Sequence, residues 1–137
     1  MSDWPKTFEH GAAPSELTAL AKRLMPELLA GEHSSLSTLR AQYQVARIDR
    51  VELTGAGFYI HFRVPSAAVR VSPGDFQGGD ASIQVEGLKH GMGCVLFVRS
   101  GRVAFLEGFT YEEEWPTDFR VVAVEDVHAI EMPHAGG

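Results

Sequence analysis

The sequence predicts an α+β fold in which two N-terminal helices pack on a mostly antiparallel sheet of five or six strands. Apolar residues recur at helical spacing between residues 14 and 45, and at a spacing of two between residues 47 and 127. Short glycine-containing turns separate the strand-like segments, which favours hairpins over parallel strands joined by helices. The 137 residues suit a single domain, 1–137. Within it we expect an N-terminal arm over residues 1–13 and a flexible tail over residues 132–137.

The first helix is expected to begin at Ser15, or at Pro14 in the first helical position. Pro26 lacks an amide donor and should kink or restart the helix, and Gly31 should end it. The apolar stripe that faces the core consists of Leu17, Leu20, Ala21, Leu24, Met25 and Leu28.

The second helix is expected over residues 34–44, with Ser34 or Ser35 as its N-terminal cap. Its apolar stripe consists of Leu36, Leu39 and Tyr43. No helical spacing follows, so helices and strands are segregated along the chain, which is typical of the α+β class.

The first predicted hairpin joins residues 48–53 to residues 58–64 through the glycine-flanked turn 54–57. In a symmetric register, its apolar side pairs Leu53 with Phe58, Val51 with Ile60 and Asp49 with Phe62. Its polar side pairs Glu52 with Tyr59 and Arg50 with His61. Residues 65–79 read as a loop that contains one short possible strand, 68–71. Further strands are expected at 82–86 and 119–125.

The second predicted hairpin joins residues 93–99 to residues 102–111 through the two-residue turn Ser100-Gly101. A symmetric register pairs Val98 with Val103, Leu96 with Phe105 and Cys94 with Glu107. Both sides of this hairpin are apolar, so we expect it at the centre of the sheet, covered on each side.

Composition excludes several classes of protein. The net charge of −6 argues against nucleic acid as the main partner. No apolar run is long enough for a membrane span or a secretory signal, so we expect a cytoplasmic protein without a membrane partner. A single cysteine forms no internal disulfide and no Cys-rich metal framework.

Negative charge is concentrated near the C-terminus. Residues 107–137 hold eight acidic side chains and one basic one, whereas residues 1–106 are nearly balanced. One interpretation is an acidic patch that attracts a basic partner. The candidate partner-binding residues are Tyr111, Glu112, Glu113, Glu114, Trp115 and Asp118, with the indole as an aromatic anchor. The alternative is a solvated face that aids solubility, on a loop held by a buried indole.

Glu107 is the most informative candidate for chemistry, because it interrupts the apolar strand 103–109. Burying a carboxylate costs several kcal/mol unless it is paired or protonated. Glu107 is therefore either a structural acceptor or a functional acid.

Cys94, with His90 four residues upstream as its base, could form a thiol site. A carboxylate opposite would raise the pKa of that thiol, and a lone strand cysteine is also a common small core residue. A metal site would need His61, His90, Cys94 and Glu107 to converge. Their spacing matches no metal motif, so no metal is expected. The glycines near residue 91 form no phosphate loop, and no cofactor is expected.

Two stretches carry a resemblance to a known family. The first runs from Thr54-Gly55-Ala56-Gly57-Phe58 to Phe62-Arg63-Val64-Pro65. The second runs from Gly91-Met92-Gly93-Cys94-Val95-Leu96-Phe97 through Leu106-Glu107-Gly108-Phe109-Thr110-Tyr111 to Trp115-Pro116. Together they resemble a family of small uncharacterised bacterial proteins, some of which are similar to immunity-type proteins of bacterial toxin systems. The resemblance implies the fold, a bacterial cytosolic setting and protein binding, but no reaction.

These observations favour a non-enzymatic, protein-binding domain that acts through its acidic C-terminal region. The alternative is a small-molecule or hydrolytic site on the sheet around Glu107, with Tyr59, His61, His90 and Cys94 beside it. A third possibility is a homodimer formed through an exposed sheet face or an edge strand.

Overall fold

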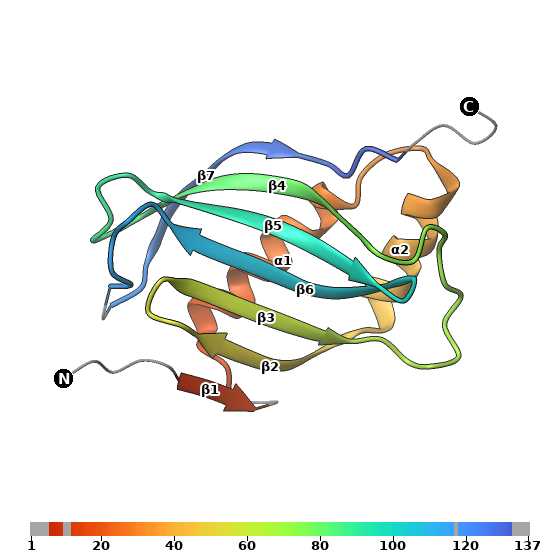
Figure 1. Ribbon diagram of the computed structural model, residues 1–137, viewed down its shortest axis with the longest axis horizontal. Helices are drawn as coiled ribbons and strands as arrows, with labels where there is room; N and C mark the ends of the chain where they lie inside the picture. The colour runs from red at the N-terminus through yellow and green to blue at the C-terminus, as the bar shows by residue number, and fades with distance from the viewer. Residues whose placement is uncertain (1–5, 10–11, 117, 133–137) are drawn as a thin grey trace.

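A computed structural model describes residues 6–9, 12–116 and 118–132 of the chain. In the described residues the elements are β1 (Lys6–Glu9), α1 (Ser15–Leu28), α2 (Ser34–Val45), β2 (Arg47–Leu53), β3 (Gly57–Arg63), β4 (Phe76–Val85), β5 (Met92–Arg99), β6 (Arg102–Thr110) and β7 (Val121–His128). The strands form one sheet in the order β1-β2-β3-β6-β5-β4-β7, and all neighbours are antiparallel (Figure 1). The α+β class with N-terminal helices is confirmed. The expected number of five or six strands is wrong, because the described residues form seven.

The additional strand is β1, which lies in the segment predicted as an arm. It pairs along the free edge of β2, with Phe8 opposite Val51. Phe8 is the one residue of β1 that is partly buried, so the segment has no alternating pattern that would identify a strand. At the opposite edge, β7 extends to His128, beyond the predicted end at residue 125. Its neighbour β4 begins at Phe76, inside the predicted loop. The possible strand at 68–71 is not formed. Of the predicted tail, only Met132 lies within the described residues.

The two helices begin close to the predicted positions but differ in detail. α1 continues through Pro26 to Leu28, so the expected restart is wrong. Pro26 lies in the last turn and is exposed, and the loss of one amide donor there interrupts little of the helix. The cap of α2 is His33 rather than Ser34 or Ser35, because its Nδ1 accepts the N–H of Ser35 at 3.0 Å.

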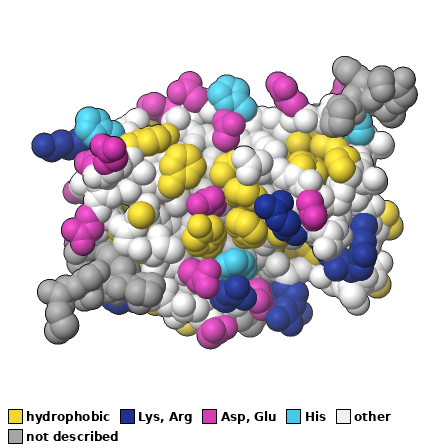
Figure 2. Space-filling model, in the orientation of Figure 1, with side chains coloured by type: hydrophobic (Ala, Val, Ile, Leu, Met, Phe, Trp, Pro, Cys, Tyr) yellow, Lys and Arg dark blue, Asp and Glu magenta, His cyan; other side chains and the backbone are white. Residues whose placement is uncertain are grey.

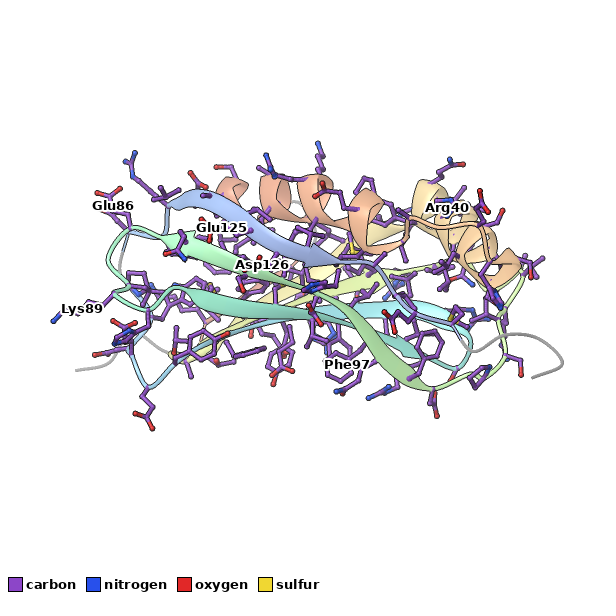
Figure 3. All side chains as sticks on the ribbon, turned by 90° about the horizontal axis from the view of Figure 1, so that it is seen from above. Arg40, Glu86, Lys89, Phe97, Glu125 and Asp126 are labelled. Atoms are coloured by element: carbon purple, nitrogen blue, oxygen red, sulfur yellow. The ribbon has the colours of Figure 1, made fainter. Side chains whose placement is uncertain are left out.

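Both helices cover the same face of the sheet. Figure 1 looks at the sheet with the helices behind it, and Figure 3 shows them on one side, with Phe97 on the other. The core fills the space between helices and sheet, and its fully buried side chains include Leu24, Leu39, Phe58 and Leu96. The other face, which we call the open face, is covered by neither α1 nor α2 and is the surface seen in Figure 2. The expectation that the second hairpin is covered on both sides is therefore wrong.

One polar side chain joins α2 to the sheet inside this core. Gln42 is 2% exposed. Its Nε2 donates to the carbonyl oxygens of Val69 at 2.7 Å and Gly101 at 2.9 Å. Its Oε1 accepts the N–H of Val103 at 2.9 Å. The amide therefore fixes α2 against both the 65–75 loop and the turn of the second hairpin.

Bulges change the register of both hairpins. In the first, the pairs Leu53–Phe58, Val51–Ile60, Glu52–Tyr59 and Arg50–His61 are confirmed, but a bulge brings Ile48 rather than Asp49 opposite Phe62. In the second, Val98 pairs with Val103 as predicted, and an irregularity follows between Phe97 and Val98. Beyond it Leu96 pairs with Leu106, Val95 with Glu107 and Cys94 with Gly108.

The shift in the second hairpin exchanges the faces of the residues that follow it. Because side chains alternate along a strand, a slip of one residue moves each side chain to the other face. Ala104 is the inserted residue, and it has no register partner on β5. Glu107, which follows the inserted residue on β6, therefore lies on the open face, whereas Cys94 on β5 stays on the core side with Val98 and Leu96.

Candidate functional site

Aromatic side chains gather at the middle of the open face. The aromatic cluster, as we call it, consists of Tyr59, His61, Phe97 and Phe105. The rings of Phe97 and Phe105 stack with centroids 4.5 Å apart. Tyr59 and His61 approach Phe105 at 5.8 and 5.6 Å. These side chains come from neighbouring positions on β3, β6 and β5. Figure 2 shows the resulting hydrophobic patch, with acidic and basic side chains around and within it.

Glu107 lies beside this cluster and is half-buried. Its Oε2 accepts a hydrogen bond from the hydroxyl of Tyr59 at 3.0 Å. None of the ion pairs among the described residues includes Glu107. The nearby histidine, His61, instead donates from Nε2 to Glu52 at 2.9 Å. This hydrogen bond is the main reason that the pKa of Glu52 is lowered. The carboxylate of Glu107 therefore has a hydrogen-bond donor but no cation from its own described chain.

The bond between Tyr59 and Glu107 also affects the ionisation of the phenol. The pKa of Tyr59 is raised above 10.0, mainly because its neutral hydroxyl donates to the carboxylate, with burial and the negative charge adding to the effect. A group whose pKa is raised on folding contributes stability below its unfolded pKa and loses it as pH rises through the folded pKa. This interaction should therefore be lost at alkaline pH.

We expect Glu107→Ala to lower the pKa of Tyr59 toward the ordinary value, because it removes both the hydrogen-bond acceptor and the negative charge that raise it. An alkaline titration of the tyrosine ring carbons by NMR measures this pKa. Tyr43 is the internal control, because burial alone raises its pKa and it should titrate unchanged in the variant. An unchanged Tyr59 titration in Glu107→Ala would contradict the assigned cause.

A shallow hollow of about 490 Å³ lies next to the aromatic cluster, over β4, β5 and β6. We call it the acidic hollow. It is lined by Gln77, Asp80, Ala81, Ser82, Gly93, Cys94, Val95, Phe97, Glu107, Phe109 and Tyr111. Two of these residues are carboxylates, three are aromatic, and none is lysine, arginine or histidine. The acidic hollow therefore combines negative charge with ring surfaces, which together suit a cation.

Gly93 determines the shape of the acidic hollow. A Cβ atom at this position would lie 2.4 Å from Cζ of Phe109 and 2.9 Å from the hydroxyl of Tyr111. Because Gly93 has no side chain, the rings of Phe109 and Tyr111 can lie over the backbone of β5. The two rings meet edge to face, with centroids 5.7 Å apart. Both are partly accessible, since Phe109 is 37% and Tyr111 46% exposed. At the rim, Asp80 pairs with His128 at 2.9 Å.

The structure does not bring the four candidate catalytic residues together. Cys94 is 1% exposed on the helix side, and burial raises the pKa of its thiol far above the ordinary value, with the charge of Glu107 as a second cause. His90 is exposed in the loop between β4 and β5. His61 pairs with Glu52 and not with Glu107. Within the described ranges, no three His, Cys, Asp or Glu side chains are placed to hold a metal ion.

The candidate partner-binding residues have different structural roles. Trp115 is 4% exposed. It stacks on Phe119 at 4.5 Å and meets Phe58 edge-on at 5.8 Å. The indole is thus a core contact that holds the segment after β6, and the expectation of an exposed aromatic anchor at this position is wrong. Tyr111 is the aromatic residue of this region that faces solvent.

Glu113 has a local structural role. Its carboxylate accepts the backbone N–H groups of Lys89 at 2.9 Å and His90 at 3.0 Å, which lowers its pKa. It therefore ties the loop after β6 to the loop between β4 and β5. The remaining acidic residues of the predicted patch, Glu112, Glu114 and Asp118, are exposed.

Sequence reasoning found Glu107, Tyr59, His61 and Tyr111 but missed Asp80, Phe97 and Phe109 as site residues. Asp80 lies outside the predicted strands, and the predicted register gives no reason to place Phe97 beside Phe105 on the open face. The correct register would reveal one signal of this site. It places large side chains on the same face at alternate positions of two adjacent strands, namely 95 and 97 of β5 with 105, 107 and 109 of β6.

Comparisons with models of known protein families, with curated proteins and with solved structures returned no match. The resemblance to small bacterial proteins therefore stays a prediction. Neither α1 nor α2, the helices of the described residues, has the length and apolar character needed to cross a membrane.

Proposed function

We propose that this protein is a non-enzymatic binding domain whose open face docks a basic segment of a partner protein. A lysine or arginine side chain of that partner would enter the acidic hollow between Asp80, Glu107 and Phe109. The observation that carries the proposal is the carboxylate of Glu107, which lies among aromatic rings with no ion-pair partner in the described chain.

The chemistry of the acidic hollow supports a cationic ligand group. A guanidinium or ammonium group gains from a carboxylate at hydrogen-bond distance and from the face of an aromatic ring. The described residues already include cation–ring contacts, because the guanidinium carbon of Arg99 lies 5.1 Å from the ring centroid of Phe97 and 6.0 Å from that of Phe105. Half-exposed aromatic residues beside a charged group are also typical of the centres of protein interfaces.

The charge of the whole chain supports the same type of partner. A net charge of −6 attracts a basic protein over long range and speeds its encounter with this surface. The exposed carboxylates of Glu112 and Glu114 follow Tyr111 in sequence and add to this field. The family resemblance implies an immunity-type role, and we include this role in the proposal: the partner would then be a toxin with a basic segment.

A hydrolytic site around Glu107 receives less support. The thiol of Cys94 is buried on the opposite side of the sheet, and His90 lies in a loop. On the open face the phenol of Tyr59 donates to the carboxylate of Glu107, but this bond raises the pKa of the phenol, which makes it a poorer nucleophile. The same face could instead join two copies of this chain, and the experiment below separates that outcome.

The test uses two peptides of equal length, one of alternating arginine and glycine and one of alternating serine and glycine. We expect the arginine peptide to shift the NMR amide signals of Val95, Glu107 and Phe109, and the serine peptide to shift none. Glu107→Lys should weaken arginine-peptide binding at least tenfold, since removing one member of a close charge pair costs about 2 kcal/mol or more.

Glu27→Lys is the matched control, because it makes the same charge change at an exposed position on α1. In about 0.15 M salt it should weaken binding less than twofold, since charges beyond the screening length contribute little. If both variants lost the same affinity for the arginine peptide, net charge alone would explain the binding, and the proposal would be overturned. Peptide-induced shifts confined to the helices, or an open face already occupied in a dimer seen by light scattering, would also overturn it.

A further inference from the structure

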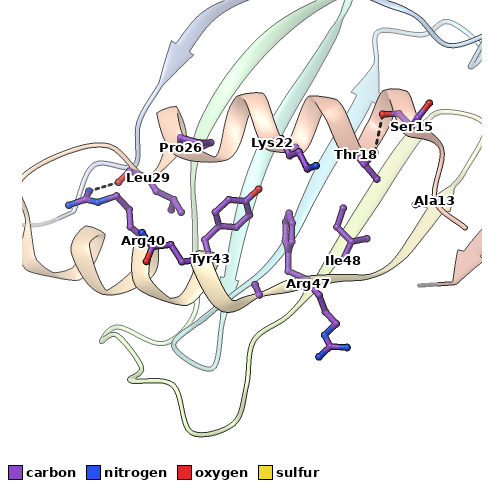
Figure 4. A pocket seen from close by; sticks show the side chains of 14 residues that line it. Ala13, Ser15, Thr18, Lys22, Pro26, Leu29, Arg40, Tyr43, Arg47 and Ile48 are labelled. Carbon is purple, nitrogen blue, oxygen red and sulfur yellow. Dashed lines mark hydrogen bonds between the residues drawn. The ribbon is translucent and has the colours of Figure 1, made fainter. Parts of the chain in front are cut away.

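A second hollow lies on the other side of the molecule, between α1 and α2. This cleft has a volume of about 790 Å³ and extends to the beginning of β2 (Figure 4). Its volume falls within the range of roughly 300–1,000 Å³ that small-molecule sites occupy. Fourteen of the described residues line it, and none of these is acidic, although the chain as a whole has a charge of −6.

The floor of the cleft is apolar. Ala21 of α1, Leu29 after α1 and Phe62 of β3 belong to the buried core and present part of their surface to the cleft. Ile48 of β2 is partly buried and continues this surface. Tyr43 of α2 meets Phe62 edge-on, with ring centroids 5.8 Å apart. Small residues on the facing side of α1, Ser15 and Thr18 among them, leave the space above this floor open.

The polar side chains that line the cleft are either neutral or positively charged. Figure 4 shows the ring of Tyr43 reaching from α2 toward α1, on the side from which Lys22 extends. Neither the hydroxyl of Tyr43 nor the ammonium of Lys22 has a hydrogen bond or ion pair with a described residue. Arg40 is held at one end of the cleft, where it donates to the carbonyl oxygens of Leu29 at 2.7 Å and Gly31 at 2.9 Å. Arg47 lies at the mouth.

We propose that this cleft binds a single-chain amphiphile with an anionic headgroup, of the type of a long-chain fatty acid. The carboxylate would bind between Lys22 and the hydroxyl of Tyr43, and the acyl chain would lie on the floor formed by Leu29, Ile48 and Phe62. The apolar floor matches the chain, and the cationic rim without acidic residues matches the headgroup. A polyphosphate ligand fits less well, because the lining has no glycine-rich loop and the guanidinium of Arg40 already donates to two carbonyl oxygens.

The test is an NMR titration of the labelled full-length protein with dodecanoate below its micelle-forming concentration. We expect saturable shifts of the amide signals of Thr18, Lys22 and Tyr43. Shortening the chain to decanoate should weaken binding by up to about fourfold for each methylene removed. Dodecyltrimethylammonium, with a cationic headgroup, should bind at least tenfold more weakly than dodecanoate.

Variants separate the contribution of the headgroup contact from that of apolar burial. Lys22→Gln should weaken dodecanoate binding at least fivefold and leave dodecanol binding unchanged. Arg23→Gln is the matched control, since Arg23 is exposed on α1 but does not line the cleft, and it should change neither. Thr18→Met should fill part of the cleft and weaken the binding of both dodecanoate and dodecanol.

Three results would overturn the proposal. The first is the absence of saturable shifts with dodecanoate. The second is the same affinity for the cationic and the anionic amphiphile. The third is a set of shifts on the open face instead of the cleft. Because the cleft and the acidic hollow lie on opposite sides of the sheet, failure here leaves the proposed protein-binding function untouched.

Discussion

Gln42→Met is expected to lower the free energy of unfolding by about 2 kcal/mol, because it leaves the buried N–H of Val103 without its partner, whereas the carbonyl oxygen of Val69 belongs to a residue that is 73% exposed and can bond to water. Each buried polar group left without a hydrogen bond costs roughly 1–3 kcal/mol. The carbonyl of Gly101 is less affected, since it also accepts the N–H of Val71 at 3.0 Å. Methionine has nearly the shape of glutamine, so a cavity or a clash contributes little.

Urea unfolding measures this effect as a lower midpoint with an unchanged slope. Gln44→Met makes the same change at an exposed position of α2 and should alter stability by less than about 0.5 kcal/mol. If the two variants were equally stable, Gln42 would not join α2 to the second hairpin as described.

Gly108→Ala is expected to destabilise the protein by about 3 kcal/mol, because the new methyl group would enter the ring of Phe58. A Cβ at Gly108 would lie 2.1 Å from Cε2 of that ring. Phe58 is completely buried and is held edge-on by Trp115 and Phe119, so the ring has little freedom to move away. Overpacking of a close-packed core typically costs 1–3 kcal/mol, and an immobile neighbour favours the upper end.

A second substitution identifies the cause. In a Phe58→Leu background, Gly108→Ala should cost less than about 1 kcal/mol, which a double-mutant cycle of unfolding energies would detect as coupling. Gly78→Ala is the control within β4, since its Cβ would come no closer than 3.8 Å to any neighbour. Additive effects of the two substitutions would show that the contact with Phe58 is not the reason for the loss.

Sequence periodicity was sufficient for most of the fold. The apolar stripe of α1 and the alternating apolar residues of the first hairpin each form one continuous buried face. In these elements the local sequence pattern therefore agrees with the tertiary structure. β1 could not be predicted, because Phe8 is its one partly buried residue and its position depends on the free edge of β2. Likewise, β4 begins within a stretch rich in glycine, where pairing with β5 overrides the local preference for a loop.

The site was harder to predict than the fold, since a single inserted residue decides which face each side chain occupies. The pair Val98–Val103 next to the turn follows from turn geometry, but nothing in the local sequence marks Ala104 as a bulge. Glu107 was therefore expected in a covered sheet, and Cys94 opposite it. The alternatives of Cys94 as a small core residue and of Trp115 as a buried indole are confirmed by their burial.

Thiol labelling at position 107 tests most directly the central claim, namely that the bulge places Glu107 on a face that no helix covers. The native cysteine, Cys94, is buried and serves as the internal reference. Under native conditions, we expect a water-soluble thiol reagent to modify one thiol per chain in Glu107→Cys and none in the original protein over the same time. Val69→Cys, at a position that is 73% exposed, gives the rate of a fully accessible thiol. Protection of the new thiol equal to that of Cys94 would contradict the register, the open face and the binding site built on them.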